Sequence, residues 1–130
     1  MSDATAANQL SILIVDDQDP VREIICSLLE DDGHIVHEVA DGFEALALLR
    51  AEKPVDLVLS DVDMPGIDGL ALCSLINAEF PSLPVLLISG RPLPAGVAAF
   101  VPKPFRASVL TQAIARLASV SRTGQVAPQR

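Results

Sequence analysis

Cysteine is scarce in this sequence, and long apolar runs are absent. Two cysteines, Cys26 and Cys73, are too few for a disulfide framework or a metal knuckle, and each stands in an apolar helical pattern. No apolar run approaches the roughly 20 residues of a membrane span, and residues 1–9 lack the basic start and apolar centre of a signal peptide. We therefore expect a cytoplasmic protein that makes no contact with membranes.

Acidic residues are absent from the last part of the chain, and basic residues are scarce in the first part. No acidic residue follows Glu79, whereas the first 80 residues hold all 17 acidic residues and only three basic ones. The net charge is therefore −14 for residues 1–80, +6 for residues 81–130 and −8 in total. An acidic chain lacks the Lys and Arg that neutralise phosphates in sequence-independent nucleic-acid binding, so we expect no direct contact with nucleic acid.

The length of 130 residues, half of them apolar, suffices for one compact domain. Short apolar runs of strand length alternate with segments in which apolar residues recur at helical spacing. The predicted strands are residues 11–15, 34–39, 55–60, 84–89 and 99–101, and the predicted helices are about 20–32, 41–52, 69–80 and 106–118. We expect one domain over residues 11–119, with flexible tails at 1–10 and 120–130.

The interval between the last two predicted strands is short and rich in proline and glycine. Residues 90–98 include Pro92, Pro94 and two glycines, and they fall at the lower limit of length for a crossover between parallel strands. We therefore expect an irregular loop with at most one turn near residues 95–98, and a helix at this place that is short or absent.

The alternation of wholly apolar strands with helices predicts an α/β fold, in which a doubly wound parallel sheet is covered on both faces. Ligands of such sheets bind beyond the carboxyl ends of the strands. The residues at these ends are Asp16 and Asp17 after the first strand, Asp61 and Asp63 after the third, Ser89 at the end of the fourth and Lys103 after the fifth. Crowded carboxylates repel one another unless they share a cation, and Mg²⁺ prefers oxygen ligands, so we expect a divalent-ion site here.

A metal site alone does not account for Ser89 and Lys103. A cation, a hydroxyl and an ammonium around a carboxylate are what a phosphoryl group transferred onto that carboxylate requires, because its charge must be spread over several donors. Aspartate acts as a nucleophile in such chemistry. The residues at this edge therefore indicate phosphoryl transfer onto an aspartate.

Four segments carry a more specific likeness. They are LIVDD at residues 13–17, LVLSDVDMPGIDG at 57–69, LLISG at 86–90 and FVPKPF at 100–105. In this order and spacing they resemble the receiver domains of two-component response regulators, over about residues 11–119. The resemblance implies a five-stranded parallel sheet of flavodoxin-like strand order 2-1-3-4-5, in which the family's fourth helix is the one that is short or absent here.

The resemblance also implies roles in the phosphoryl site. Asp61 is the phosphoacceptor, Ser89 is the hydroxyl residue that turns towards the phosphoryl group, and Lys103 pairs with that group. The Lys103–Pro104 peptide bond is typically cis in the family. Phe100 stands where the family places its switch aromatic, although an ordinary core residue is an equally good interpretation.

The implied cofactor is Mg²⁺, with Mn²⁺ as a substitute. Asp17 and Asp61 would bind the ion directly together with the backbone carbonyl of Asp63, and Asp16 would act largely through water. The Asp63 side chain stands two residues beyond the acceptor, as Arg91 stands two residues beyond Ser89. We expect these two side chains to pair across the mouth of the pocket.

The implied function is that of a response regulator in a two-component phosphorelay. The domain would accept a phosphoryl group from a histidine kinase or a histidine phosphotransfer protein, and its switched surface would signal to a protein partner. It would not be an enzyme beyond self-phosphorylation and self-dephosphorylation, and it would be a monomer or a weak dimer. The sequence identifies neither the kinase nor the target.

Two other interpretations remain open at this point. The segment Asp61-Val62-Asp63 after an apolar strand also fits the paired aspartates of haloacid-dehalogenase-like small phosphatases. That motif normally follows the first strand, however, and it would leave Asp16 and Asp17 unexplained. A non-phosphorylated pseudo-receiver acting as a binding module would lack the acceptor or the lysine, and neither is missing here.

Overall fold

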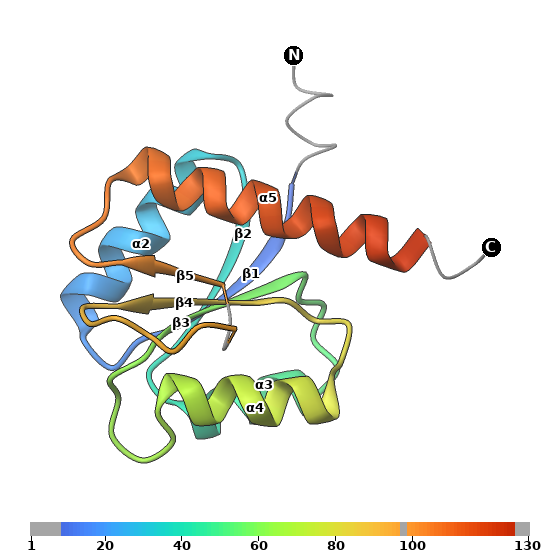
Figure 1. Ribbon diagram of the computed structural model, residues 1–130, viewed down its shortest axis with the longest axis horizontal. Coiled ribbons are helices and arrows are strands. Elements are labelled where there is room, and N and C mark those ends of the chain that lie inside the picture. Colours follow the sequence, from blue (N-terminus) through green and yellow to red (C-terminus); the bar gives the residue numbers. More distant parts are fainter. Residues whose placement is uncertain (1–8, 97–98, 127–130) are drawn as a thin grey trace.

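Five parallel strands form a single sheet. The computed structural model describes residues 9–96 and 99–126. The strands are β1 (Ser11–Val15), β2 (Ile35–Val39), β3 (Leu57–Asp61), β4 (Val85–Ser89) and β5 (Ala99–Pro102), and their order across the sheet is β2-β1-β3-β4-β5 (Figure 1). Every neighbouring pair runs parallel, so the predicted fold class and strand order are confirmed.

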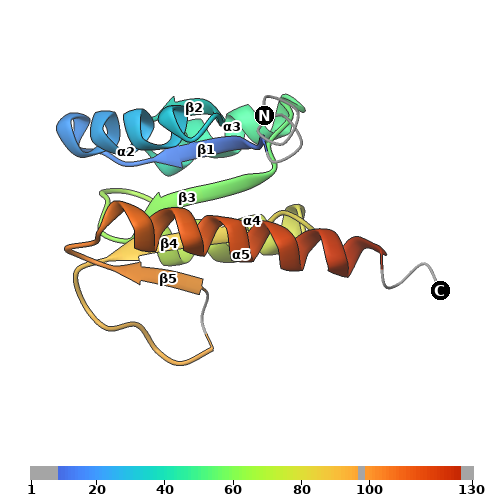
Figure 2. The same cartoon turned by 90° about the horizontal axis from the view of Figure 1, so that it is seen from above.

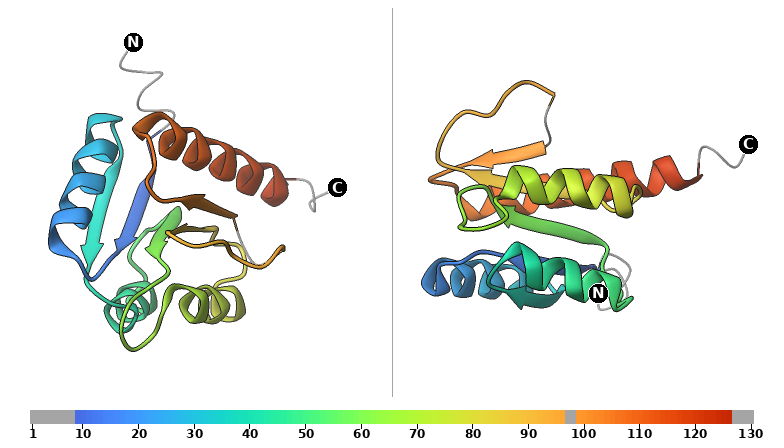
Figure 3. Two further views of the ribbon diagram at one scale, coloured as in Figure 1. Left: turned by 60° about the vertical axis from the view of Figure 1, so that its left-hand side comes forward. Right: turned by 90° about the horizontal axis from the view of Figure 1, so that it is seen from below.

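Four helices in the described residues cover the two faces of the sheet. Helices α2 (Asp19–Asp31) and α5 (Ala107–Val126) lie on one face, and α3 (Gly42–Arg50) and α4 (Gly69–Glu79) lie on the other (Figures 1 and 3). None of these helices combines the length and the apolar character that a membrane crossing needs.

Side chains of the inner strands alternate between two apolar layers, because successive residues of a strand point to opposite faces. In β1, Ile12 and Ile14 pack in the layer beneath α2 and α5, whereas Leu13 and Val15 pack in the layer beneath α3 and α4. All four side chains are at most 1% exposed. The unbroken apolar runs of the sequence therefore become strands buried on both faces.

Helices α3 and α4 begin at aspartate caps that the sequence supplies. The Asp41 carboxylate accepts the N–H of Glu44, and the Asp68 carboxylate accepts the N–H of Ala71, each at 2.8 Å. Both bonds satisfy backbone donors that the first turn of a helix leaves without partners. The caps help to set where each helix starts after the strand and loop that precede it.

The connection from β4 to β5 contains no helix in its described residues, 90–96. A turn lies at residues 95–96, where Gly96 has a φ of 80°. Leu93, from this loop, packs against the apolar layer beneath α3 and α4. The predicted irregular loop is thus confirmed over residues 90–96, and the rest of the interval, 97–98, lies outside the described residues.

Helix α5 continues to Val126, so the predicted end near Ala118 is wrong. The predicted end rested on the apolar stripe of residues 109–117, and the helix continues beyond that stripe. No proline occurs between residues 107 and 126, and each residue added to an existing helix gains a backbone hydrogen bond. Residues 120–126, predicted as part of a flexible tail, are therefore helical, and residues 1–8 and 127–130 lie outside the described residues.

Gly69 allows α4 to start directly against the end of β3. A Cβ atom at this position would lie 2.3 Å from the carbonyl oxygen of Asp61 and 2.7 Å from the Cα of Val62. The Gly69 N–H also donates to the Val62 carbonyl at 2.8 Å. Any larger residue must push the helix away from the strand that carries Asp61.

We expect Gly69→Ala to lower the free energy of unfolding by about 1–3 kcal/mol, because the added methyl meets backbone atoms that have no free space to move into. Gly90→Ala is the matched control, since its Cβ would meet nothing within 4 Å. Urea denaturation of both variants measures the difference. Equal stability of the two variants would show that the contact between α4 and β3 is not tight.

Candidate functional site

The carboxyl ends of the strands face the same edge of the sheet, as the arrowheads in Figure 2 show. Asp16 and Asp17 follow β1, and Asp61 is the last residue of β3, which lies beside β1 in the sheet. The carboxylate oxygens of these three residues lie within 4.8 Å of one another. The structure therefore brings together the carboxylates of three of the four aspartates that the sequence places at this edge, and the Asp63 carboxylate is not one of them.

Lys103 forms an ion pair with Asp61. Its Nζ lies 2.7 Å from Oδ1 of Asp61, whose side chain is 7% exposed, whereas that of Lys103 is 32% exposed. The backbone N–H of Lys103 donates to the carbonyl of Ser89 at 2.8 Å, which holds the start of the β5–α5 loop against the end of β4. The backbone of Lys103 is thus anchored beside the end of β4, and its ammonium contacts the candidate acceptor.

Asp16 is a buried carboxylate, 2% exposed. Burial is the largest effect on its pKa and raises it above the ordinary value, and the negative charges of Asp61 and Asp17 raise it further. The N–H of Gln18, which donates to Asp16 Oδ1 at 2.8 Å, acts in the opposite direction. Ionised Asp16 is therefore held at a cost, which a nearby cation would offset.

The three carboxylates fit a small divalent cation. One ammonium, that of Lys103, faces three acidic groups, so the described site carries an excess of negative charge. All the side-chain ligands are oxygens, and Asp17 is exposed, which leaves one side open to water. Such a donor set suits Mg²⁺ or Mn²⁺. The backbone carbonyl of Asp63 as a further ligand stays a prediction.

Ser89 lies at the end of β4 and is 1% exposed. Its hydroxyl donates to the carbonyl of Arg91 at 2.7 Å and accepts the N–H of the same residue at 3.1 Å. The hydroxyl is therefore engaged by the first residues of the β4–β5 loop. Its predicted contact with a phosphoryl group requires it to give up the Arg91 carbonyl.

The predicted pair of Asp63 and Arg91 is confirmed. Arg91 Nη2 lies 3.3 Å from Asp63 Oδ1, and the two side chains are 51% and 66% exposed. An exposed pair of this kind adds little to stability. It joins the loop after β3, which follows the candidate acceptor, to the loop after the neighbouring strand β4.

Phe100 lies on β5, directly opposite Leu87 of β4, and is 38% exposed. A side chain with this exposure is not an ordinary core residue. Its role as a switch stays a prediction. The Lys103–Pro104 peptide bond is cis, as the resemblance implies.

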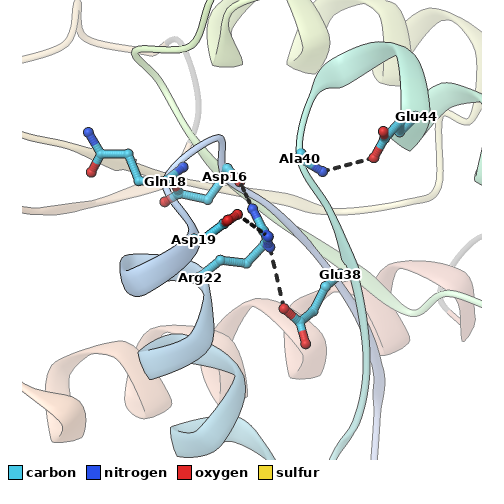
Figure 4. A network of polar contacts seen from close by, with 7 residues as sticks. All are labelled: Asp16, Gln18, Asp19, Arg22, Glu38, Ala40 and Glu44. Carbon is cyan, nitrogen blue, oxygen red and sulfur yellow. Dashed lines mark hydrogen bonds and ion pairs between the residues drawn. The ribbon is translucent and has the colours of Figure 1, made fainter.

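Arg22 is the residue at this site that the sequence-based reasoning missed. Its guanidinium donates to the backbone carbonyl of Asp16 and also contacts Asp19 and Glu38 (Figure 4). The sequence feature that could have pointed to it is that Arg22 is the only Lys or Arg among the first 49 residues. It stands five residues after Asp17, one turn into the following helix, from where a long side chain reaches back to the loop.

Comparison with known proteins gives one consistent family. The family described as "Response regulator receiver domain" matches residues 12–115. The transcriptional regulatory protein CseB of Streptomyces coelicolor is 39% identical over 124 residues, which are 89% of this chain and 51% of that protein. The response regulator MprA of Mycolicibacterium vanbaalenii is 36% identical over 119 residues, 85% of this chain and 50% of that protein. The chain thus spans about half the length of these curated relatives.

A solved structure shares both the fold and part of the sequence. The signal receiver domain of a signal transduction histidine kinase from Syntrophus aciditrophicus superposes with a TM-score of 0.77 and 33% identity. The match covers 85% of this chain and 90% of that one.

We expect Asp16→Asn to raise the melting temperature of the metal-free protein by several degrees, because it removes a buried charge beside Asp61 and Asp17. The raised pKa of Asp16 means that wild-type stability falls as pH rises above the ordinary value of 3.8. The gain from the substitution should therefore be full at neutral pH and shrink as pH approaches that value. Thermal melts in EDTA at several pH values measure it.

The same substitution, and Asp17→Asn, should weaken Mg²⁺ binding by about tenfold or more, as read by titration calorimetry. Glu23→Gln, at an exposed position on α2, is the control and should bind Mg²⁺ like the wild type. Unchanged Mg²⁺ affinity in both aspartate variants would remove the metal assignment.

Proposed function

The chain belongs to the response regulator receiver domain family of two-component signalling, and from this premise we propose that it accepts a phosphoryl group on Asp61. The observation that carries the proposal is the 2.7 Å contact between Lys103 and Asp61 within a group of three carboxylates. A nucleophilic carboxylate, a paired ammonium and an acidic group suited to Mg²⁺ are the parts that phosphoryl transfer onto aspartate needs.

In the proposed reaction, a carboxylate oxygen of Asp61 attacks phosphorus of a phosphohistidine as the phosphorus–nitrogen bond breaks. Bound Mg²⁺ would supply positive charge against the acceptor and the phosphoryl oxygens. The Lys103 ammonium would move its contact from Asp61 Oδ1 to a phosphoryl oxygen. At about 4 Å and an effective dielectric near 20, that attraction is roughly 4 kcal/mol before desolvation.

Ser89 connects the acceptor to the surface. Its hydroxyl donates to the Arg91 carbonyl, and turning to donate to a phosphoryl oxygen would release that carbonyl. The released peptide belongs to the β4–β5 loop, which leads into the strand that carries Phe100. We propose that the signal leaves the site along this loop and β5, where the family has its fourth helix and this chain has none in residues 90–96.

The phosphatase alternative has no support in the geometry. It requires the Asp63 carboxylate to act beside Asp61, but Asp63 is engaged by Arg91 and is not part of the carboxylate group. The binding-module alternative requires a lost acceptor or lysine, whereas Asp61 and Lys103 are both present and paired. A cytoplasmic location and a monomeric or weakly dimeric state remain predictions from the sequence.

The proposed donor is a histidine kinase or a histidine phosphotransfer protein. A protein donor must cover the edge of the sheet that holds Asp61. Beside Lys103 lies an open groove of about 560 Å³, whose apolar walls are formed by Val21, Ile24, Leu28, Pro104 and Phe105. Ile24 is 60% exposed at the wall of this groove. Exposed apolar surface next to a reactive site is typical of protein contacts, so we propose that the donor binds here.

We expect the wild-type protein to take up phosphate from a small phosphodonor such as acetyl phosphate only when Mg²⁺ is present. Asp61→Asn should take up none, because the nucleophile is gone, while Asp63→Asn should retain uptake. Radiolabelling or intact-protein mass spectrometry measures the product. Labelling of Asp61→Asn at the wild-type level would overturn the assignment of the acceptor.

Phosphotransfer profiling against purified histidine kinases tests the donor. Ile24→Ser should slow transfer from the preferred kinase by about tenfold, as the loss of one central apolar contact does, and leave uptake from acetyl phosphate unchanged. Leu75→Ser is the matched control, since Leu75 is 41% exposed on α4, outside the groove. Equal transfer rates for the two serine variants would count against a donor in the groove.

A further inference from the structure

Arg22 makes three contacts with three different segments. Its Nη1 donates to the backbone carbonyl of Asp16, its Nη2 pairs with the Asp19 carboxylate, and its Nε lies 3.3 Å from Glu38 Oε1 on β2. The side chain is 15% exposed. Figure 4 shows the guanidinium between these three partners. Each of its nitrogens is thus committed to a separate acceptor.

These contacts fix the backbone at the acidic group. The peptide between Asp16 and Asp17 is planar, so the direction of the Asp16 carbonyl also sets the plane from which Asp17 starts. The N–H of Asp16 donates to the Val39 carbonyl at 3.3 Å, and its carboxylate accepts the N–H of Gln18. Arg22 supplies the remaining restraint, at the carbonyl. Asp16 is therefore held at its amide, its carbonyl and its carboxylate.

The bond from Arg22 to the Asp16 carbonyl acts against the repulsion among the three carboxylates. Asp16, Asp17 and Asp61 place three carboxylates within 4.8 Å, and their mutual repulsion favours turning one of them away. The exposed Asp17 has open solvent to turn into. A peptide plane that is fixed at the Asp16 carbonyl prevents the part of this movement that requires the backbone to rotate.

The positive charge of Arg22 does not explain its effect on the acidic group. Asp19 and Glu38 already balance that charge, and both lie outside the group of three carboxylates. The useful property is the shape of the guanidinium, a planar fork whose nitrogens point in different directions. A lysine at this position would keep the charge but would offer a single nitrogen to three separated acceptors.

We propose that Arg22 is a positioning residue for the divalent-ion site, which holds the Asp16–Asp17 peptide in the orientation that presents both carboxylates to one ion. The inference rests on the proposed function, in that it takes the three carboxylates as the Mg²⁺ site. It adds a residue outside that group, on α2, which sets the affinity of the site without touching the ion.

The test compares Mg²⁺ affinity in Arg22→Lys and Arg22→Gln with that of the wild type, by titration calorimetry without any phosphodonor. Both variants should bind Mg²⁺ about tenfold more weakly, the lower end of what loss of a supporting hydrogen bond costs a metal site. Circular dichroism at the titration temperature establishes that each variant is folded. Mg²⁺ affinity of folded Arg22→Lys within twofold of the wild type would overturn the proposal.

Arg50→Lys is the matched control. Arg50 also joins two elements through its guanidinium, since it binds Glu79 at 2.9 and 2.8 Å between the ends of α3 and α4. Arg50→Lys makes the same change of guanidinium to ammonium in an ion pair between two elements away from the carboxylates, and it should leave Mg²⁺ affinity unchanged. Equal weakening of Mg²⁺ binding in Arg50→Lys and Arg22→Lys would show a general effect of stability and would overturn the positioning role.

Phosphorylation by acetyl phosphate provides the second readout. In Arg22→Lys the Mg²⁺ concentration for half-maximal rate should rise about tenfold, while the rate at saturating Mg²⁺ stays within twofold of the wild type. A lower saturating rate with an unchanged Mg²⁺ requirement would overturn the inference. Failure of this inference can be told from failure of the proposed function. A wild-type protein that binds Mg²⁺ but accepts no phosphoryl group would contradict the proposed function and leave the positioning role of Arg22 standing.

Discussion

Repulsion among carboxylates at the ends of two adjacent strands is the constraint on which the rest of this structure depends. The buried sheet holds Asp16 and Asp61 close together, so their like charges repel each other. Their surroundings exclude most of the water that would weaken this repulsion. The fold accepts this cost because strands covered on both faces gain far more from apolar burial. The repulsion that results is local, and a bound cation would relieve it.

The fold was predictable because its signals are local and repeated. Runs such as residues 11–15 and 84–89 are apolar at every position, which separates a buried parallel strand from an amphipathic one, and Pro and Gly punctuate the chain between elements. The end of α5 was not predictable from apolar spacing, since the segment SVSRTGQV at residues 119–126 is mostly polar. A helix that continues past its apolar stripe leaves no such pattern in the sequence.

The site was predictable to the extent that topology alone places it. Residues that follow parallel strands share one edge of the sheet, so the topology alone predicts that Asp16, Asp61 and Lys103 lie close together. The role of Arg22 was not predictable in this way. Its side chain reaches back from a helix to the Asp16 carbonyl, and every residue has a backbone carbonyl, so the sequence does not show which one is bound. The same holds for the bond from Ser89 to Arg91, which is a property of one loop conformation.

The position of β5 at the border of the sheet has a consequence for self-association. Among residues 9–96 and 99–126, no further strand pairs with its outer side, and an unpaired strand edge is a template on which another chain can pair. This strand is four residues long and ends in Pro102, which has no N–H to donate. Its shortness and its missing donor make it a poor template for an added strand, so the chemistry of its own backbone protects this edge of the sheet.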